Sequence, residues 1–223
     1  MFWALRGGGA GSWGVIIDAT FSTIPIFNAT LHVVNILTTT LDQTASLMAT
    51  HAKHISDWDR VRAGQYFNLT GSTLSIRTLF KDLDGDASKA QMSSFLADAA
   101  KLGASIQGED TLTTFINDMV EFPDDLAGFN LILSSRLIPG SVYTNAPESV
   151  GPAYKQLLSQ GIPSVLGSLI AGGAFYFQDV PLSHSKLTIH AGQVAANAHI
   201  DSAVLPAWRT AKTHVSILTD TVF

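Results

Sequence analysis

The hydrophobic pattern near the start of the chain predicts strands. β-branched and aromatic residues dominate residues 15–25, and Pro25 ends this run. A second run of the same kind covers residues 31–38. Residues 67–80 have the pattern of a hairpin, because the dipeptide Gly71-Ser72 separates two apolar runs.

A helical period alternates with these strands. Leu47, His51, Ile55 and Trp58 recur at helical spacing, which predicts a helix over residues 42–58 with one apolar face. The same reasoning predicts helices at residues 88–102, 111–120 and 148–160, and a short strand at residues 104–107.

Extended segments are expected again in the second half of the chain, together with a helix at residues 207–213. Strands interspersed with helices, each with an apolar face that needs a sheet, indicate an α+β fold class. We expect an antiparallel sheet covered by helices on one side. The extended segments of this half are residues 129–139, 165–178, 187–192 and 214–222.

Composition narrows the possible partners of the chain. Only 14% of its 223 residues are charged and its mean hydropathy is positive, so much of the surface is expected to be buried or to meet another part of a larger protein. A net charge of -5 without a basic patch speaks against nucleic acid. The longest uncharged run, residues 162–178, is shorter than the roughly 20 residues that span a membrane, so no membrane partner is expected.

Neither a thiolate site nor a hydrolase site is expected. The chain contains no cysteine, which excludes disulfides and thiolate-bound metals. The serine and histidine residues are scattered without a Gly-x-Ser-x-Gly elbow, so nothing supports a hydrolytic triad.

Two other clusters have a structural and a metal-binding interpretation. His51 and His54 could form a metal pair, but no third ligand lies nearby in the sequence, which favours a structural role on the helix. Residues 82–86 resemble the start of a calcium loop. Gly85 is fourth instead of sixth, however, and Ser93 stands where a bidentate Glu is needed. This segment is therefore interpreted as a turn with an N-cap for the next helix.

The glycine-rich stretch from Arg6 to Ile17 is the most demanding part of the backbone, with five glycines in eight positions. The spacing Gly9-x-Gly11-x-x-Gly14 matches a dinucleotide-binding fingerprint, but a strand pattern follows it where that fingerprint needs a helix. No Lys followed by Ser or Thr closes a phosphate loop either. The remaining interpretation is a turn whose exposed N–H groups can line a flat or anionic ligand.

Residues 2–16, FWALRGGGAGSWGVI, resemble a segment of FAD-linked oxidases of the vanillyl-alcohol-oxidase-like superfamily, which includes berberine-bridge-like and fungal alcohol or oligosaccharide oxidases. In that family the segment closes the FAD-binding domain, and its backbone lies along the flavin. The resemblance implies FAD as the cofactor, with Trp3 and Trp13 packed in the core beside the turn. The residues implied in cofactor binding are Gly7, Gly8, Gly9, Gly11, Gly14, Val15 and Ile16.

Two later segments, residues 134–139 and 202–209, resemble recurring segments of the fungal members, with Leu205 in place of the usual Asn. The resemblance implies that residues 1–28 end an FAD-binding domain and that residues 29–223 form a substrate domain. It also implies an internal portion of a longer protein, without the phosphate-binding loop and the flavin-linking His of the family. We therefore expect the chain alone to bind FAD poorly.

The function implied is oxidation of an alcohol, sugar or similar small organic substrate. Such a flavin oxidase needs a proton acceptor within hydrogen-bond reach of the substrate. Candidates on expected strands are Tyr176, His190 and Arg136, the last able to stabilise negative charge. The position after Gly172-Gly173 where berberine-bridge-like enzymes place an acid is filled by aromatic residues, which speaks against berberine-type chemistry.

Two further expectations concern the whole protein. Secretion is implied by the resemblance, and two glycosylation sequons begin at Asn28 and Asn68. The alternative function is a non-catalytic secreted binding domain that keeps the substrate fold without flavin.

Overall fold

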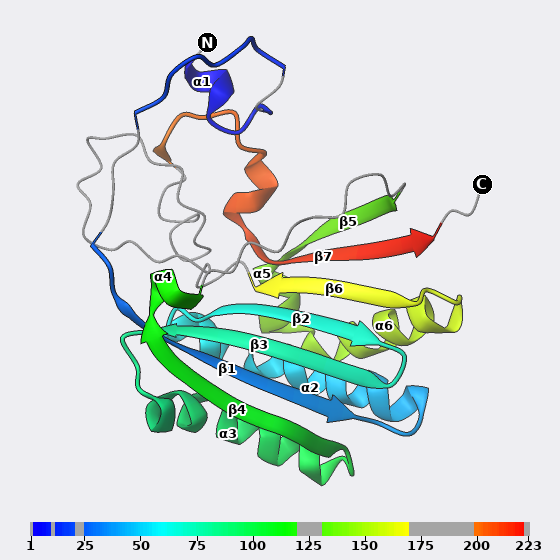
Figure 1. Ribbon diagram of the computed structural model, residues 1–223. Coiled ribbons are helices and arrows are strands. Elements are labelled where there is room, and N and C mark those ends of the chain that lie inside the picture. Colours follow the sequence, from blue (N-terminus) through cyan, green and yellow to red (C-terminus); the bar gives the residue numbers. More distant parts are fainter. Residues whose placement is uncertain (1, 10–11, 21–24, 120–130, 170–198, 221–223) are drawn as a thin grey trace.

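The computed structural model describes residues 2–9, 12–20, 25–119, 131–169 and 199–220 (Figure 1). A single sheet of seven strands dominates these residues, in the order β4-β1-β3-β2-β6-β7-β5, and every neighbouring pair is antiparallel. The strands are β1 (Asn28–Leu37), β2 (Gly64–Thr70), β3 (Thr73–Lys81), β4 (Ser105–Phe115), β5 (Leu131–Pro139), β6 (Ser164–Leu169) and β7 (Ala211–Asp220).

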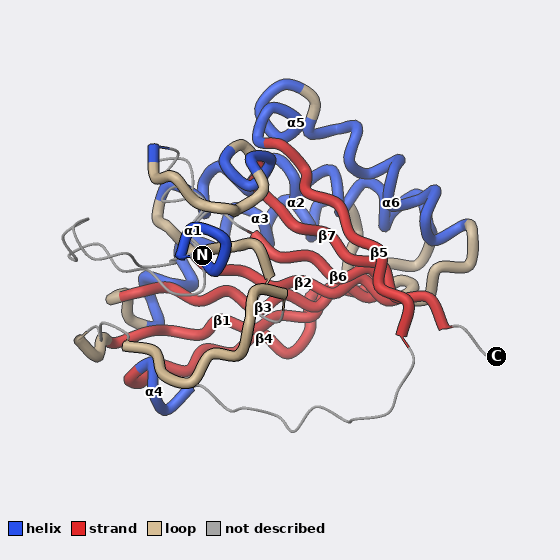
Figure 2. The backbone as a smooth tube through the Cα atoms, turned by 90° about the horizontal axis from the view of Figure 1, so that it is seen from above, coloured by secondary structure: helices blue, strands red, loops and turns tan. Residues whose placement is uncertain are grey.

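Three helices, α2 (Leu41–Arg60), α3 (Gly85–Lys101) and α6 (Val150–Ser159), cover one face of the sheet (Figures 1 and 2). The fold is therefore α+β with an antiparallel sheet covered by helices on one side, as the sequence predicts. Short helical elements complete the described chain: α1 (Phe2–Leu5), α4 (Ile116–Met119), α5 (Gly140–Asn145), η1 (Pro147–Ser149) and η3 (Pro206–Arg209).

The hydrophobic core lies between the sheet and this helical layer. Alternate residues of each strand point at the helices, so that in β3 Leu74 and Ile76 are fully buried while Arg77 is exposed. From the helical side, Trp58 of α2 and Phe95 of α3 fill the same layer. Burial of each such side chain contributes about 1.5–3 kcal/mol. The other face of the sheet has no helical layer among the described residues.

Local signals in the sequence explain most of these elements. The hairpin of β2 and β3 turns at Gly71, whose φ of +57° favours glycine. Thr40 caps α2 by accepting a hydrogen bond from the Gln43 amide, and Asp84 caps α3 in the same way through Ala87. The N-cap interpretation of residues 82–86 is thereby confirmed.

Two of the predictions of secondary structure are wrong. Residues 111–115, expected to start a helix, belong to the long edge strand β4, and only α4 after them is helical. Three β-branched threonines in this segment favour extended structure, and pairing with β1 decides it. Residues 15–20, expected to be a strand, have no regular structure, because no described strand offers them hydrogen-bond partners.

Other predictions are confirmed only over part of their length. The strand expected at residues 165–178 is β6 as far as Leu169, and the rest lies outside the described residues, as does the segment 187–192. The helix expected at residues 207–213 is the short η3, after which β7 begins at Ala211. The sequence reasoning did not anticipate α5.

Candidate functional site

The first glycines of the N-terminal stretch are required by packing within the chain itself. Gly7 has φ +112°, and a Cβ there would lie 2.6 Å from Val204 Cγ2 and 2.7 Å from the Val204 amide nitrogen. A Cβ on Gly8 would lie 2.5 Å from the Ala4 carbonyl oxygen. A side chain at Gly7 would therefore push the N-terminal stretch away from Val204, and one at Gly8 would disrupt the turn that follows α1.

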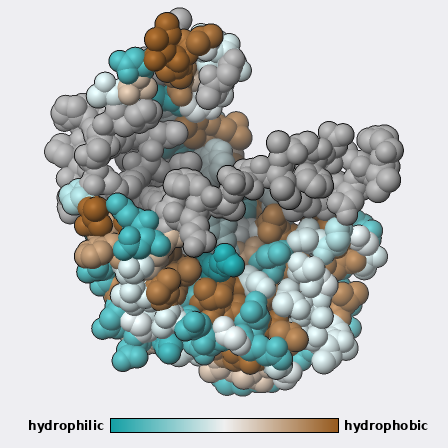
Figure 3. Space-filling view, in the orientation of Figure 1, coloured by the Kyte–Doolittle hydropathy of each residue, from teal (hydrophilic) through white to brown (hydrophobic). Residues whose placement is uncertain are grey.

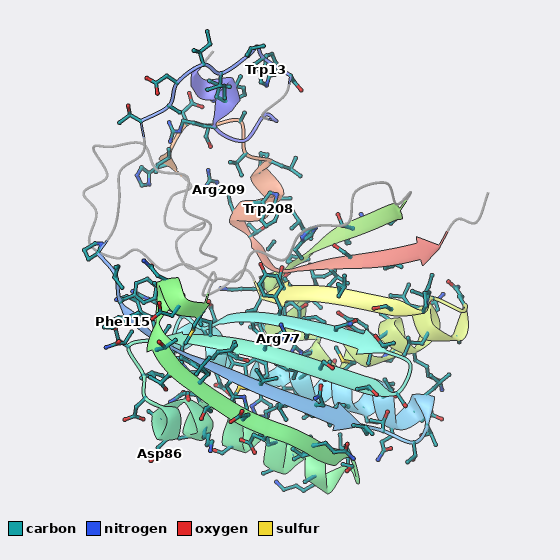
Figure 4. The ribbon with its side chains drawn as sticks, in the orientation of Figure 1. Trp13, Arg77, Asp86, Phe115, Trp208 and Arg209 are labelled. Carbon is teal, nitrogen blue, oxygen red and sulfur yellow. The ribbon has the colours of Figure 1, made fainter. Side chains whose placement is uncertain are left out.

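Hydrogen bonds hold the same two segments together. Trp3 Nε1 donates to Asp201 Oδ1 at 2.6 Å, and the Arg6 guanidinium donates to the Asp201 carbonyl oxygen at 3.3 Å. Trp13 Nε1 donates to the Gly8 carbonyl oxygen at 3.0 Å, which closes the glycine turn. We call residues 2–9 and 12–14 together with residues 199–209 the clasp (Figures 1 and 4).

The two tryptophans in the N-terminal part of the clasp lie at its surface. Trp3 is 49% exposed and Trp13 is 48% exposed, so the expectation that they pack in a core is wrong. Each ring uses its indole N–H as a hydrogen-bond donor to tie the clasp together. Hydrophobic residues gather on the outer surface of the N-terminal segment, at the top of Figure 3.

The later glycines leave bare backbone that nothing in the described chain covers. Gly9 and Gly14 have φ values of +94° and +137°. A Cβ on Gly14 would meet no atom within 4 Å, and one on Gly9 would meet only Ser12 Oγ, at 3.6 Å. Beside them, Val15 and Ile17 are 92% and 95% exposed. The backbone at Gly9 and Gly14 is therefore open to close approach by a flat ligand. Gly11 lies outside the described residues.

A polar cavity of about 360 Å³ adjoins the clasp. His199, Asp201, Ser202 and Arg209 contribute its polar groups, and Arg209 Nη2 donates to Ser202 Oγ at 3.3 Å. Figure 4 shows Arg209 and Trp208 on η3, between the N-terminal segment and β7. All residues that line this cavity belong to the segment 199–209 of the clasp.

The open face of the sheet carries a second group of functional side chains. Residues directly opposite each other in an antiparallel sheet share a face, so the strand register defines a row that crosses all seven strands. We call it the open-face row. Its members, in spatial order, are Asp110, Val33, Arg77, Tyr66, Ser168, His214 and Leu137.

Three members of the row have side chains suited to catalysis. Tyr66 is 62% exposed, and its neighbour Arg77 is also exposed, on the side of the sheet away from the helices (Figure 4). His214 is half-buried, with its ring 5.4 Å from the Trp208 ring centroid. Together they offer a hydroxyl, a fixed cation and an imidazole to a ligand on the open face.

Of the predicted catalytic residues, only Arg136 belongs to the described chain, and it lies on the other side of the sheet. Arg136 of β5 pairs with Val215, whose side chain is buried under the helices, so Arg136 lies on the helical side of the sheet. A catalytic role for Arg136 stays a prediction. Tyr176 and His190 fall outside the described residues.

Tyr66, Arg77 and His214 were missed by the sequence reasoning. The predicted hairpin contained a usable signal for two of them, because a turn at Gly71-Ser72 pairs Thr70 with Thr73 and, counting outward, Tyr66 with Arg77. No comparable local signal identifies His214, because β7 joins β6 from a distant part of the sequence.

The histidines of α2 have structural roles. His51 is buried, its Nε2 donates to Gln65 Oε1 at 2.7 Å, and Gln65 Nε2 donates to Thr78 Oγ1 at 3.0 Å. Burial lowers the pKa of His51 to about 4, so the ring is neutral at pH 7. His54 Nε2 lies 3.1 Å from Asp98 Oδ2, and the pKa of that carboxyl is lowered by Lys101 first and His54 second.

Neither a metal site nor a membrane span is found in the described part of the chain. No three His, Asp or Glu side chains within it meet as possible metal ligands. None of its helices combines the length and the apolar character needed to cross a bilayer.

Known proteins resemble this chain in sequence and in fold. No profile of a known protein family matches the chain. An uncharacterized FAD-linked oxidoreductase of Arthroderma benhamiae is 26% identical over 247 aligned positions, which cover 99% of this chain and 38% of that protein. The chain thus spans well under half of the length of this relative.

Solved structures share the fold. The VAO-type flavoprotein MtVAO615 of Myceliophthora thermophila C1 superposes with a TM-score of 0.71 at 17% identity, covering 96% of this chain and 37% of that protein. Glucooligosaccharide oxidase of Acremonium strictum superposes with a TM-score of 0.58 at 11% identity, covering 89% of this chain and 39% of that protein. The chain is thus similar in sequence to an FAD-linked oxidoreductase, and it shares the fold of VAO-type flavoproteins.

Proposed function

We propose that the chain provides the flavin-contacting segment and the substrate-binding sheet of an FAD-dependent oxidoreductase that oxidises an alcohol, a sugar or a similar small organic substrate. One observation carries the proposal: the segment with bare glycine backbone runs on the side of the sheet away from α2 and α6, the side that bears the open-face row (Figure 2). In this proposal residues 1–28 end an FAD-binding domain and residues 29–223 form the substrate domain.

The residues of the glycine segment fit one edge of a flavin. Bound FAD would accept a hydride from the substrate. The uncovered backbone at Gly9 and Gly14 permits close approach of a flat ring, and the exposed side chains of Val15 and Ile16 offer apolar contact. The proposed contacts also include Gly7, Gly8 and Gly11. The chain supplies no phosphate loop of the Lys-Ser/Thr type, so it contributes contacts to the ring and not to the phosphates.

The open-face row supplies the groups that oxidation of a hydroxyl requires. The Arg77 guanidinium orients a polar substrate and stabilises negative charge on its oxygen. The Tyr66 hydroxyl and the His214 imidazole are positioned to hold or accept the hydroxyl proton. Tyr176 and His190 remain further candidates for the proton acceptor, and Arg136 remains a candidate for stabilising negative charge. A sugar substrate is supported by the fold shared with a protein named glucooligosaccharide oxidase.

Secretion of the full-length protein is also proposed, from the sequons and the resemblance. Asn28 is exposed at the start of β1, whereas Asn68 Oδ1 accepts hydrogen bonds from Ser164 Oγ at 2.6 Å and Thr70 Oγ1 at 3.3 Å. Asn28 is therefore the better acceptor of a glycan. Deglycosylation of protein from a secreting host should lower the mass of the parent chain but not of the N28Q variant; unchanged mass in the parent would contradict glycosylation.

Flavin binding is tested by comparing FAD with lumiflavin, which has the ring but no phosphates. The 223-residue chain is titrated into each flavin, and binding is measured by quenching of flavin fluorescence. Both flavins should bind weakly, with dissociation constants within about threefold of each other, because only ring contacts are made. The G14V variant should weaken both, since its side chain occupies the ring-facing space. T20V, an exposed substitution in the same segment, serves as the control.

Three outcomes contradict the flavin proposal. Stoichiometric, tight FAD binding would show that the chain holds the phosphates as well. Equal affinity of G14V and T20V would place the ring elsewhere. Absence of binding for both flavins would favour the alternative of a non-catalytic binding domain.

Because the 223-residue chain is expected to bind FAD only weakly, the substrate side is tested in the full-length protein loaded with FAD, with an artificial electron acceptor. We expect R77Q to lower kcat/KM for an oligosaccharide at least tenfold, because an oriented charge contact is lost. Ser75 belongs to the neighbouring row on the same face, and S75A should change kcat/KM less than threefold. Equal effects of the two variants would contradict a role for the open-face row.

A further inference from the structure

A second cavity, of about 460 Å³, lies on the helical side of the sheet. It is bounded by β5 and β7 at the sheet edge and by α5 and α6 above them. The open-face row lies on the other side of β7, because His214 and Val215 alternate across that strand. The cavity is therefore separate from the proposed flavin side and does not depend on it.

The interior of this cavity is apolar. Aliphatic side chains come from all four elements, which is typical of sites that take small organic ligands. They are Ile138, Val142, Val150, Ala153, Leu157, Val215 and Ile217.

Tyr154, a buried tyrosine, contributes a hydroxyl to the cavity wall. The Tyr154 side chain is only 6% exposed, and its hydroxyl has no hydrogen-bond partner in the described chain. The neighbouring Tyr143 differs, because its hydroxyl is hydrogen-bonded to Thr213 Oγ1. Burial raises the pKa of Tyr154 well above its ordinary value, so the hydroxyl keeps its proton and remains a donor.

A cationic side chain that has no carboxylate partner among the described residues lies at the edge of the cavity. Arg136 is exposed on β5, lines the cavity, and forms no ion pair with any described residue. Lys212, by contrast, pairs with Asp59, and Lys155 with Asp42. The hydroxyls of Ser134, Ser135 and Ser149 also line the cavity. The guanidinium is its cation and the Tyr154 hydroxyl can donate a hydrogen bond, so a ligand with anionic acceptor oxygens would match both groups.

We propose that this cavity binds a small apolar monocarboxylic acid, with the carboxylate held by Arg136 and the Tyr154 hydroxyl and the hydrocarbon portion among the aliphatic side chains. A carboxylate matches the planar guanidinium in a bidentate manner and can accept the hydroxyl proton as well. An alcohol or an ester of the same length would leave the guanidinium without its counter-charge.

Decanoate is the probe for calorimetric titration of the 223-residue chain, with 1-decanol and acetate as matched ligands that lack the charge and the tail. We expect decanoate to bind with a dissociation constant at least tenfold below those of decanol and acetate. R136Q should weaken decanoate at least tenfold and Y154F severalfold, whereas R77Q, which removes an arginine from the opposite face, should have no effect.

Steric blocking provides an independent test. Ala153 is exposed on α6 and lines the cavity, so A153W should abolish decanoate binding without unfolding the chain, which thermal unfolding verifies. Gln156 is exposed on the same helix outside the cavity lining, and Q156W is the matched control. Equal affinity for decanoate and decanol, unchanged binding in A153W, or no binding of decanoate to the parent chain would each overturn the proposal.

Discussion

His51 shows how one polar residue of the core couples stability to pH. Its ring lies 5.0 Å from the Trp58 ring, 4.9 Å from Phe67 and 5.7 Å from Phe95, measured between centroids. A protonated ring would have to remain charged among these aromatic side chains, with Gln65 as its hydrogen-bond acceptor. The neutral form is therefore the one that the fold stabilises.

The sign of the pH dependence follows from proton binding in the two states. The unfolded chain protonates His51 below its ordinary value of 6.5, and the folded chain only near 4, so between these values the unfolded state binds more protons. The free energy of unfolding should fall as pH is lowered from 6.5 to 4, by up to about 3 kcal/mol from this residue.

Urea unfolding at several pH values, for the parent chain and for H51Q, measures this contribution. Gln keeps a hydrogen-bond donor for Gln65 but does not titrate. The difference in free energy of unfolding between the parent chain and H51Q should therefore shrink steadily as pH falls. H54Q, at a residue that contacts Asp98 near the surface, is the control. Parallel curves for the parent and H51Q would contradict the low pKa.

At the scale of elements, α3 illustrates how a local signal determines a boundary. Asp84 accepts a hydrogen bond from the Ala87 amide at 2.7 Å, and the helix then runs to Lys101, after which Gly103 takes φ +78°. The acidic segment between β3 and α3 is therefore a turn, and its carboxylate at Asp84 serves as the N-cap of α3.

Asp84→Ala should lower the free energy of unfolding by about 1 kcal/mol, because the first turn of α3 loses its acceptor. Asp86→Ala removes a carboxylate from the same turn without removing the cap and should cost only a few tenths of that. Thermal unfolding with and without millimolar Ca²⁺ tests the other interpretation. A calcium-dependent increase in Tm that either substitution removes would show a metal site.

The elements that the sequence predicts well are those with local determinants. The hairpin at Gly71 and the capped helices α2 and α3 depend on residues within a few positions, and these were recognised. The prediction of a helix over part of β4 is wrong, because pairing with β1, 68 to 87 residues away, outweighs the local helical period. In the candidate site, the glycine segment can be recognised from its resemblance to a known family. The open-face row cannot be recognised without the order of all seven strands, which the local sequence does not give.

Arg136 and Arg77 show what that order decides. Both are strand residues with exposed side chains, and nothing in their immediate sequence tells them apart. Pairing with Val215 places Arg136 on the helical side, and pairing with Tyr66 places Arg77 on the open side. A shift of one residue in either register would exchange these faces.

At the scale of the whole molecule, the sheet consists of two contiguous halves. Residues 28–119 form β4, β1, β3 and β2, and residues 131–220 contribute β6, β7 and β5. The halves meet where β2 pairs with β6, and there the Phe67 ring lies directly over Gly167. A second junction joins α2 to α6, where Gly151 packs on the Ala45 carbonyl group.

Gly167→Ala should destabilise the chain by about 1–3 kcal/mol, because a methyl group there would overlap the Phe67 ring. The same substitution in a Phe67→Leu background should cost clearly less, since the smaller side chain leaves room. Denaturant unfolding of the four chains gives the coupling energy between the two sites. Additive effects would contradict the contact between ring and glycine.

The division of the sheet into halves has a consequence for synthesis of the protein. All four strands of the first half, with α2 and α3, are encoded before the first residue of β5, so this half can pair its strands as soon as it leaves the ribosome. Until β6 follows, β2 is a bare edge whose N–H and C=O groups are open to other chains. Aggregation during translation should therefore begin at β2, and a chaperone that shields this edge would act between the emergence of β4 and that of β6.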